Sequence, residues 1–182
     1  TDSYDGAVSQ LILIENDKLL LFYHENDHGH VGPDGRIVMR RSTNYGKTWS
    51  ERRIVHHVNN KNAINPSVIY IPRSGRIVLF DEVIDFAGSP DPQPGPNNRP
   101  QGEDRSTYLI ESTDHGQTWH EPVEISEKFN AEEAVPHGGG VRNSTGVRTF
   151  FYNEQIEMLH SKDGGKTWDR STPIVTSPGG RA

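Results

Sequence analysis

The sequence predicts an all-β protein built from repeated antiparallel hairpins. One eight-residue pattern occurs three times, at residues 42–49 (STNYGKTW), 112–119 (STDHGQTW) and 161–168 (SKDGGKTW), and all three Trp residues of the chain close a copy. The 182 residues also include 18 Gly and 12 Pro, which indicates many turns between short strands. A pattern that recurs with turn residues at fixed offsets is typical of a repeat architecture.

Each copy of the pattern contains the residues of a tight hairpin turn. An Asp or Asn side chain accepts hydrogen bonds from backbone N–H groups a few residues on. A Gly allows left-handed backbone, and the Trp is a large apolar anchor for the outgoing strand. These three positions are Asn44, Gly46 and Trp49 in the first copy; Asp114, Gly116 and Trp119 in the second; and Asp163, Gly165 and Trp168 in the third.

Composition argues against several classes of protein. The net charge is −6 and no basic stripe is visible, so nucleic acid is not an expected partner. The chain has no Cys, which excludes disulfides and thiol catalysis. No apolar run approaches the roughly 18 residues needed to span a bilayer, so no membrane partner is expected. No cofactor is predicted either.

The copies begin at residues 42, 112 and 161, and the second spacing, 49 residues, suits one four-stranded unit. The first spacing is longer by about the length of residues 87–104, a Pro- and Gly-rich segment predicted to be a loop. Four strands are predicted in each unit. They are 8–14, 18–24, 36–42 and 52–57; then 66–71, 76–83, 106–112 and 123–126; and finally 139–142, 147–153, 155–161 and 173–176.

The repeated pattern resembles the Asp box, S-x-D-x-G-x-T-W, of the sialidase (neuraminidase) superfamily and other BNR-repeat proteins. Further stretches are similar to the early strands of bacterial-type sialidases: 17–23 (DKLLLFY), 37–42 (IVMRRS), 65–68 (NPSV) and 74–78 (SGRIV). The resemblance implies a β-propeller in which each box joins the third and fourth strands of a blade. It implies one partial propeller domain over 1–182, with blades at about 7–58, 63–127 and 136–177, taken from a six-bladed ring.

Three wedge-shaped sheets cannot close a ring, because propellers close with about four to eight blades. The expected partners are therefore the remaining blades in the same protein, or a second copy in a homodimer. The resemblance further implies a glycan ligand and an extracellular or periplasmic location. The implied function is a sialidase-like glycoside hydrolase acting on glycans, and the alternative is a non-catalytic propeller that binds glycans or a protein.

Catalytic residues of sialidases carry over poorly to this chain. The family places one Arg of its substrate-binding triad before the first strand, where this chain has Tyr4 to Val8, and another after the second strand, where Glu25 and Asn26 stand. A sugar carboxylate would lose a bidentate partner without them. Activity on sialic acid itself is therefore not assigned.

The segment 24–30 (HENDHGH) is the stretch richest in groups that can transfer protons. Asp27, His28 and His30 are the candidate catalytic residues here, since an acid can protonate a glycosidic oxygen and imidazole titrates near neutral pH. The same residues could ligate a metal, although their spacing fixes no geometry and none is assigned. A solvated polar loop is the third possibility.

Equivalent loops of the other units add further candidates. Glu82 and His137 are candidate catalytic residues, and Glu25, Asn65 and Asp81 are candidate substrate-binding residues. Because loops after second strands and before first strands open on one face of a propeller, we expect Asp27, His28 and His30 to converge with Asp81, Glu82 and His137.

Overall fold

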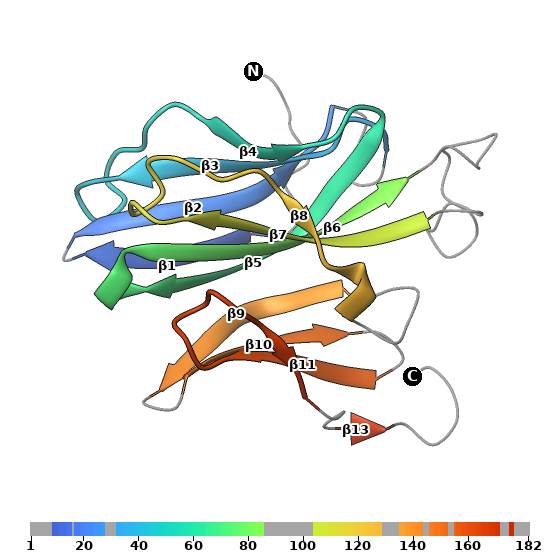
Figure 1. Ribbon diagram of the computed structural model, residues 1–182. Coiled ribbons are helices and arrows are strands. Elements are labelled where there is room, and N and C mark those ends of the chain that lie inside the picture. The colour runs from blue at the N-terminus through green and yellow to red at the C-terminus, as the bar shows by residue number, and fades with distance from the viewer. Residues whose placement is uncertain are drawn as a thin grey trace.

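The computed structural model describes residues 9–15, 17–27, 32–85, 104–128, 135–143, 146–152, 155–171 and 175–176. Three antiparallel sheets follow one another in chain order and stack face to face, from the top to the bottom of Figure 1. Each sheet is a meander in which consecutive strands are neighbours. This arrangement confirms the all-β prediction and its division into four-stranded units.

The strands occupy the following ranges. The first sheet contains β1 (Ser9–Glu15), β2 (Lys18–Glu25), β3 (Arg36–Ser42) and β4 (Arg53–His57). The second contains β5 (Lys61–Ile71), β6 (Arg76–Asp85), β7 (Asp104–Ser112) and β8 (Val123–Glu124), with short 3-10 turns at Pro72–Ser74 (η1) and Ser126–Lys128 (η2). The third contains β9 (Val135–Asn143), β10 (Gly146–Tyr152), β11 (Gln155–Ser161) and β12 (Asp169–Arg170), and β13 (Val175–Thr176) also pairs with β11.

Two apolar layers hold the sheets together. Runs that are apolar on both faces, such as 77–80 (IVLF), supply side chains to both layers because successive strand residues point to opposite faces. Ile77 and Leu79 enter the layer between the first and second sheets, whereas Val78 and Phe80 enter the layer between the second and third. The second sheet is thus the centre of the fold.

Each Asp box joins the third and fourth strands of its sheet, as predicted. In the second box, Asp114 Oδ1 accepts hydrogen bonds from the backbone N–H groups of Gln117 (2.9 Å) and Thr118 (2.8 Å), and the Ser112 hydroxyl accepts from Gly116 N–H (2.9 Å). The third box repeats this geometry around Asp163. Two consecutive residues are left-handed in every box, namely Tyr45 and Gly46, His115 and Gly116, and Gly164 and Gly165.

Several strand limits differ from the sequence-based expectation. β5 begins at Lys61 rather than Pro66 and β9 at Val135 rather than Gly139. A β-bulge between Ile64 and Ser67 accommodates Pro66, which cannot donate a ladder hydrogen bond. The fourth strands are shorter than predicted. In the third sheet the fourth strand is β12 at Asp169–Arg170, before the predicted strand 173–176, of which Val175–Thr176 forms β13. Among the described residues, no helix is long and apolar enough to cross a membrane.

Candidate functional site

The candidate residues gather at one end of the sheets, which we call the exit edge. There β2 and β6 end, and β3, β5, β7 and β9 begin, at the right of Figure 1. The Asp boxes lie at the opposite end. Four groups of buried polar side chains occupy the exit edge and the adjoining strands of the first two sheets.

The first group surrounds Glu25 at the end of β2. Glu25 is fully buried and accepts from Arg36 Nε (3.3 Å) and from Arg52 Nη1. Arg36 also makes a bidentate ion pair with Asp27, with N···O distances of 2.9 and 3.2 Å. The hydrogen bonding of Arg36 to Asp27, in which the guanidinium donates, is the main cause that raises the pKa of Arg36 above its ordinary value. A buried carboxylate therefore fixes two guanidinium groups, and one of these holds Asp27.

The second group joins the loop after β2 to the second sheet. His24 Nε2 donates to Asn62 Oδ1 (2.8 Å), and Asn26 Nδ2 donates to the same oxygen (3.2 Å) and to the carbonyl of Gly32 (2.8 Å). The backbone at Gly35 lies so close that an added Cβ would stand 1.6 Å from Asn62 Oδ1. All three polar side chains are buried, so this network fixes both ends of the loop that begins with Asp27.

The third group is a buried His–Asp pair between the first and second sheets. His56 Nδ1 on β4 donates to Asp81 Oδ2 on β6 at 2.6 Å, and the His56 ring packs against Tyr108 with centroids 5.0 Å apart. Asp81 Oδ1 has no hydrogen-bond partner among the described residues. Burial raises the pKa of Asp81, although its hydrogen bond and charge interaction with His56 oppose the shift.

The fourth group surrounds Glu82 on the other face of β6. Glu82 is buried and accepts from Asn65 Nδ2 (2.8 Å) and from Arg105 Nη1 on β7. Asn65 lies in the bulge of β5 with a left-handed φ of 57°, which turns its amide toward Glu82. Two candidates chosen from sequence, Asn65 and Glu82, are thus in direct contact.

The structure separates other candidates. Asp81 and Glu82 are neighbours on one strand and point to opposite faces, so they do not share one site. Asp27 lies at the exit edge and is 51% exposed. His28 and His30 lie outside the described residues, and for His137 only the backbone, in β9, is described. The expected convergence on His137 therefore stays a prediction.

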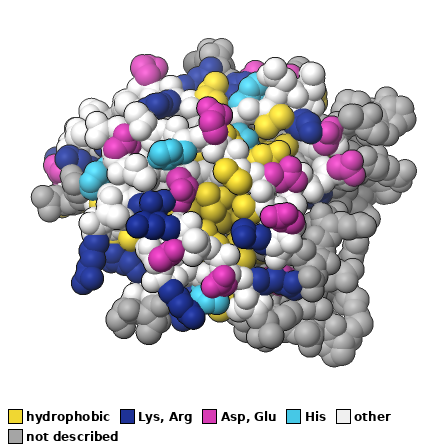
Figure 2. All heavy atoms as spheres, in the orientation of Figure 1, with side chains coloured by type: hydrophobic (Ala, Val, Ile, Leu, Met, Phe, Trp, Pro, Cys, Tyr) yellow, Lys and Arg dark blue, Asp and Glu magenta, His cyan; other side chains and the backbone are white. Residues whose placement is uncertain are grey.

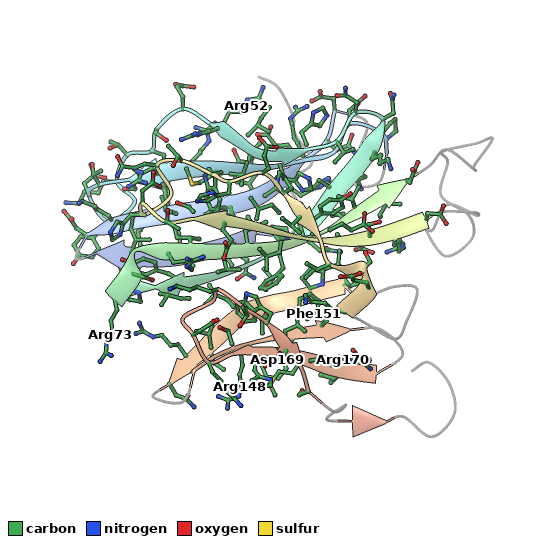
Figure 3. The ribbon with its side chains drawn as sticks, viewed as in Figure 1. Arg52, Arg73, Arg148, Phe151, Asp169 and Arg170 are labelled. Carbon is green, nitrogen blue, oxygen red and sulfur yellow. The ribbon has the colours of Figure 1, made fainter. Side chains whose placement is uncertain are left out.

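Sequence reasoning missed the cationic partners of these carboxylates. Arg36 is the first residue of β3 and Arg105 is the second residue of β7, and these strands lie beside the strands that carry Glu25 and Glu82. An Arg at the start of a third strand was the available signal. Arg52, which Figure 3 shows at the upper side of the first sheet, is 27 residues from Glu25 in sequence and had no local signal.

No group of three or more His, Cys, Asp or Glu side chains in the described parts of the chain is arranged to hold a metal ion. The exit edge instead combines carboxylates with guanidinium and amide groups. Of these groups, the Asp27 carboxylate is half exposed and lies beside Arg36. Figure 2 shows that charges of both signs are interspersed over the face drawn there.

Known proteins share this fold and its repeats. The BNR/Asp-box repeat family matches residues 110–121 and 159–170. An exo-alpha-sialidase of Arthroderma benhamiae is 27% identical over 167 residues, which cover 80% of this chain and 39% of that protein. A sialidase of Clostridium perfringens is 25% identical over 196 residues, which cover 91% of this chain and 49% of that protein.

Solved structures agree with these sequence relatives. The Hadza microbial sialidase Hz136 superposes with a TM-score of 0.71 at 20% identity over 93% of this chain and 37% of its own. The protein is therefore a homologue of sialidases that carries BNR/Asp-box repeats and has the sialidase fold over the region compared. The chain spans less than half the length of the curated relatives it matches.

Proposed function

We propose that the three sheets are consecutive blades of a six-bladed sialidase-type propeller, within one partial domain with blades at about 7–58, 63–127 and 136–177. We further propose that the protein is a sialidase-like glycoside hydrolase acting on glycans outside the cytoplasm. Support comes from the sialidase homologues and from the collection of ionisable groups at the exit edge. Propellers host many functions, so the fold supports the reaction class only through this site.

One observation favours Asp27 as the acid. All four candidate carboxylates are paired, but Glu25, Asp81 and Glu82 are buried, whereas Asp27, which is held by Arg36, is half exposed at the exit edge. A group that protonates a glycosidic oxygen must reach substrate, and only Asp27 of these four meets that condition. Glu25 then acts on Asp27 through Arg36, and the Asn65–Glu82 contact shapes the neighbouring surface. His28, His30 and His137 remain proposed proton-transfer partners.

Release of a fluorogenic alcohol from acidic and neutral glycosides tests this proposal. We expect Asp27→Asn to lower kcat by about 100-fold or more, because a positioned acid or base contributes roughly 10²–10⁴ to rate. The matched control is Asp17→Asn, in the turn between β1 and β2 at the opposite end of the same sheet. Equal activity of the two variants would reject Asp27 as the acid.

A non-catalytic propeller that binds glycans or a protein is the second candidate. The observation that favours it is the pairing of Glu25 and Glu82 with Arg and of Asp81 with His56, which makes these carboxylates structural. A glycan array distinguishes the two. Saturable binding without hydrolysis of any bound glycan would favour the binding module.

A further inference from the structure

At the exit edge, three cations near the strand ends are held in ion pairs. The pairs are Arg36 with Glu25 and Asp27, Lys61 with Asp85, and Arg105 with Glu82. The charges of these side chains are therefore balanced by carboxylates of the same chain.

The opposite end of the second and third sheets is built differently. Three segments meet there, namely the η1 turn, the turn between β9 and β10, and the third Asp box. An added Cβ at Gly165 of the box would lie 2.8 Å from Ile71 Cδ1, beside η1. One at Gly146, which opens β10, would lie 3.6 Å from Lys162 Cα of the box. The box therefore lies between the two turns.

Four exposed cations, which we call the cationic patch, come from these segments. They are Arg73 of η1, Arg142 near the end of β9, and Lys162 and Lys166 of the box. Within the part of the chain that the structure describes, none of the four makes an ion pair. Figure 3 shows Arg73 directed away from the sheets, and Figure 2 shows Lys and Arg side chains at the lower left, where this end of the sheets lies. Because three separate segments form the patch, no basic run marks it in the sequence.

The carboxylates beside the patch balance little of its charge. Asp163 accepts hydrogen bonds from two backbone N–H groups and a hydroxyl of its own box, at 2.7 to 3.0 Å. Glu111 is paired with Arg76 at 2.6 Å. Asp169, which follows the box, is 73% exposed and offsets at most one of the four charges. The patch thus carries an excess of positive charge.

The position of the patch keeps it open. Neighbouring sheets pack on the faces of a sheet, whereas turns at strand ends lie at its edge. A sheet that packs on the third sheet therefore leaves these turns accessible. The patch also lies at the end opposite the exit edge, so a ligand bound there does not cover Asp27.

We propose that the cationic patch binds a linear acidic polysaccharide, whose carboxylate or sulfate groups pair with its four cations. Guanidinium groups suit such anions because they can donate two parallel hydrogen bonds. Stacked sheets lie about 10 Å apart, so cations from two sheets are spread over more than one sugar. A membrane fits less well, since the described residues of the three segments expose no large apolar side chain for insertion. The choice of a polysaccharide rests on the proposed action on glycans, and the patch itself does not depend on catalysis.

Biolayer interferometry of the immobilised protein with chondroitin sulfate tests the proposal. We expect saturable binding that weakens as salt is added, because exposed ion pairs are screened, and no binding of neutral dextran. The double variant Arg73→Ala with Lys166→Ala should weaken the dissociation constant by about 10-fold, because it removes two of the four cations. Both side chains are exposed in turns, so the fold should persist.

Lys128→Glu, in η2 near the exit edge, is the matched control. It changes the net charge by the same amount as the double variant and should leave the affinity for chondroitin sulfate unchanged. Absence of binding would overturn the proposal, and so would a double variant that binds as tightly as the wild type. Equal or tighter binding of duplex DNA or of phosphatidylserine vesicles would assign the patch to another class of partner and would overturn it too.

The proposal and the proposed catalysis can fail separately. The double variant Arg73→Ala with Lys166→Ala should hydrolyse small fluorogenic glycosides as the wild type does, because its substitutions lie at the end opposite the exit edge. Asp27→Asn should bind chondroitin sulfate as tightly as the wild type. Loss of polysaccharide binding in Asp27→Asn would contradict the location of the binding surface.

Discussion

Single residues in the boxes show how one side chain controls a turn. Hydrogen bonds from Thr167 hold the pKa of Asp163 well below its usual range. Partial burial opposes the shift at Asp114, but hydrogen bonds from Thr118 and Ser112 lower the pKa of that carboxyl too. Asn44 keeps the acceptor for Thr48 N–H (2.9 Å), but its Nδ2 donates to the Thr48 hydroxyl, whereas the hydroxyls of Thr118 and Thr167 donate to their Asp.

This difference predicts that the second and third boxes, but not the first, lose stabilising interactions when the pH is lowered. A pKa lowered on folding contributes stability above the ordinary Asp value of about 4, and the contribution is lost as the pH falls below it. We expect Asp114→Asn and Asp163→Asn each to reduce the fall in unfolding free energy between pH 5 and pH 2, measured by urea denaturation. Asn44→Asp should increase the fall. The same pH slope in all four proteins would contradict this origin.

The contribution of Asp81 to stability should depend on pH in the opposite direction. Because its pKa is raised by burial, its contribution to stability is present below about pH 4 and is lost as the pH rises through the raised pKa. Asp81→Asn keeps an acceptor for His56 but cannot ionise, so the variant should gain stability relative to the wild type between pH 4 and pH 7. Urea denaturation at several pH values measures the difference. If the difference in unfolding free energy between the wild type and Asp81→Asn does not change with pH, burial of the Asp81 charge does not destabilise the protein.

At the scale of elements, the boxes act both as hairpin turns and as contacts between sheets. Trp168 is buried in the second apolar layer and also donates from Nε1 to the carbonyl of Gly165 (3.1 Å). Trp49 has the same place in its hairpin but lies outside both layers. Comparing Trp168 with Trp49 therefore compares a box that packs on the preceding sheet with one whose Trp lies outside both apolar layers.

Trp168→Ala should lower the unfolding free energy by about 3–5 kcal/mol, because a buried aromatic is removed from a packed layer. Trp49→Ala should cost less than half as much. Urea denaturation followed by circular dichroism, which does not depend on Trp fluorescence, measures both losses. Equal losses of unfolding free energy in the two variants would show that packing on the preceding sheet is not the main contribution of a box Trp to stability.

The close contact between Gly35 and Asn62 should make the protein's stability sensitive to substitution of Gly35. An added Cβ overlaps Asn62 Oδ1, so Gly35→Ala should cost roughly 3 kcal/mol or more. The double variant Gly35→Ala with Asn62→Ala should recover part of that loss, since it removes the overlapping atom. Gly139→Ala is the control, because its added Cβ would lie 3.4 Å from its nearest neighbour. Thermal unfolding of the wild type and the three variants measures these changes in stability. A Gly35→Ala variant as stable as the wild type would show that the contact with Asn62 does not fix the backbone at Gly35.

Elements with local signals were predictable from sequence, and long-range partners were not. The boxes and the strands beside them follow from turn residues and apolar runs. The start of β5 was misplaced because Pro66 and the polar Asn62 and Asn65 look like a turn, although contacts with other strands bury Asn62 and form a bulge at Asn65. At the candidate site, Asp27 was proposed from its loop, but its link to Glu25 through Arg36 depends on strand register.

For the whole molecule, three stacked sheets place paired carboxylates at one end and Asp boxes at the other. The buried pairs at the exit edge, Glu25 with Arg36 and Glu82 with Arg105, belong to two different sheets. The first pair is linked to the half-exposed Asp27 through Arg36. The outer faces of the first and third sheets retain exposed apolar side chains such as Leu11 and Val141.

The central proposal is that this protein is a sialidase-like glycoside hydrolase. Incubating it with a panel of acidic and neutral glycans, and following the sugar anomeric signals by NMR, tests the claim most directly. We expect one glycan class to be cleaved, with turnover that Asp27→Asn abolishes and Asp17→Asn preserves. Glycans that bind saturably and stay intact, with Asp27→Asn binding as tightly as the wild type, would contradict it.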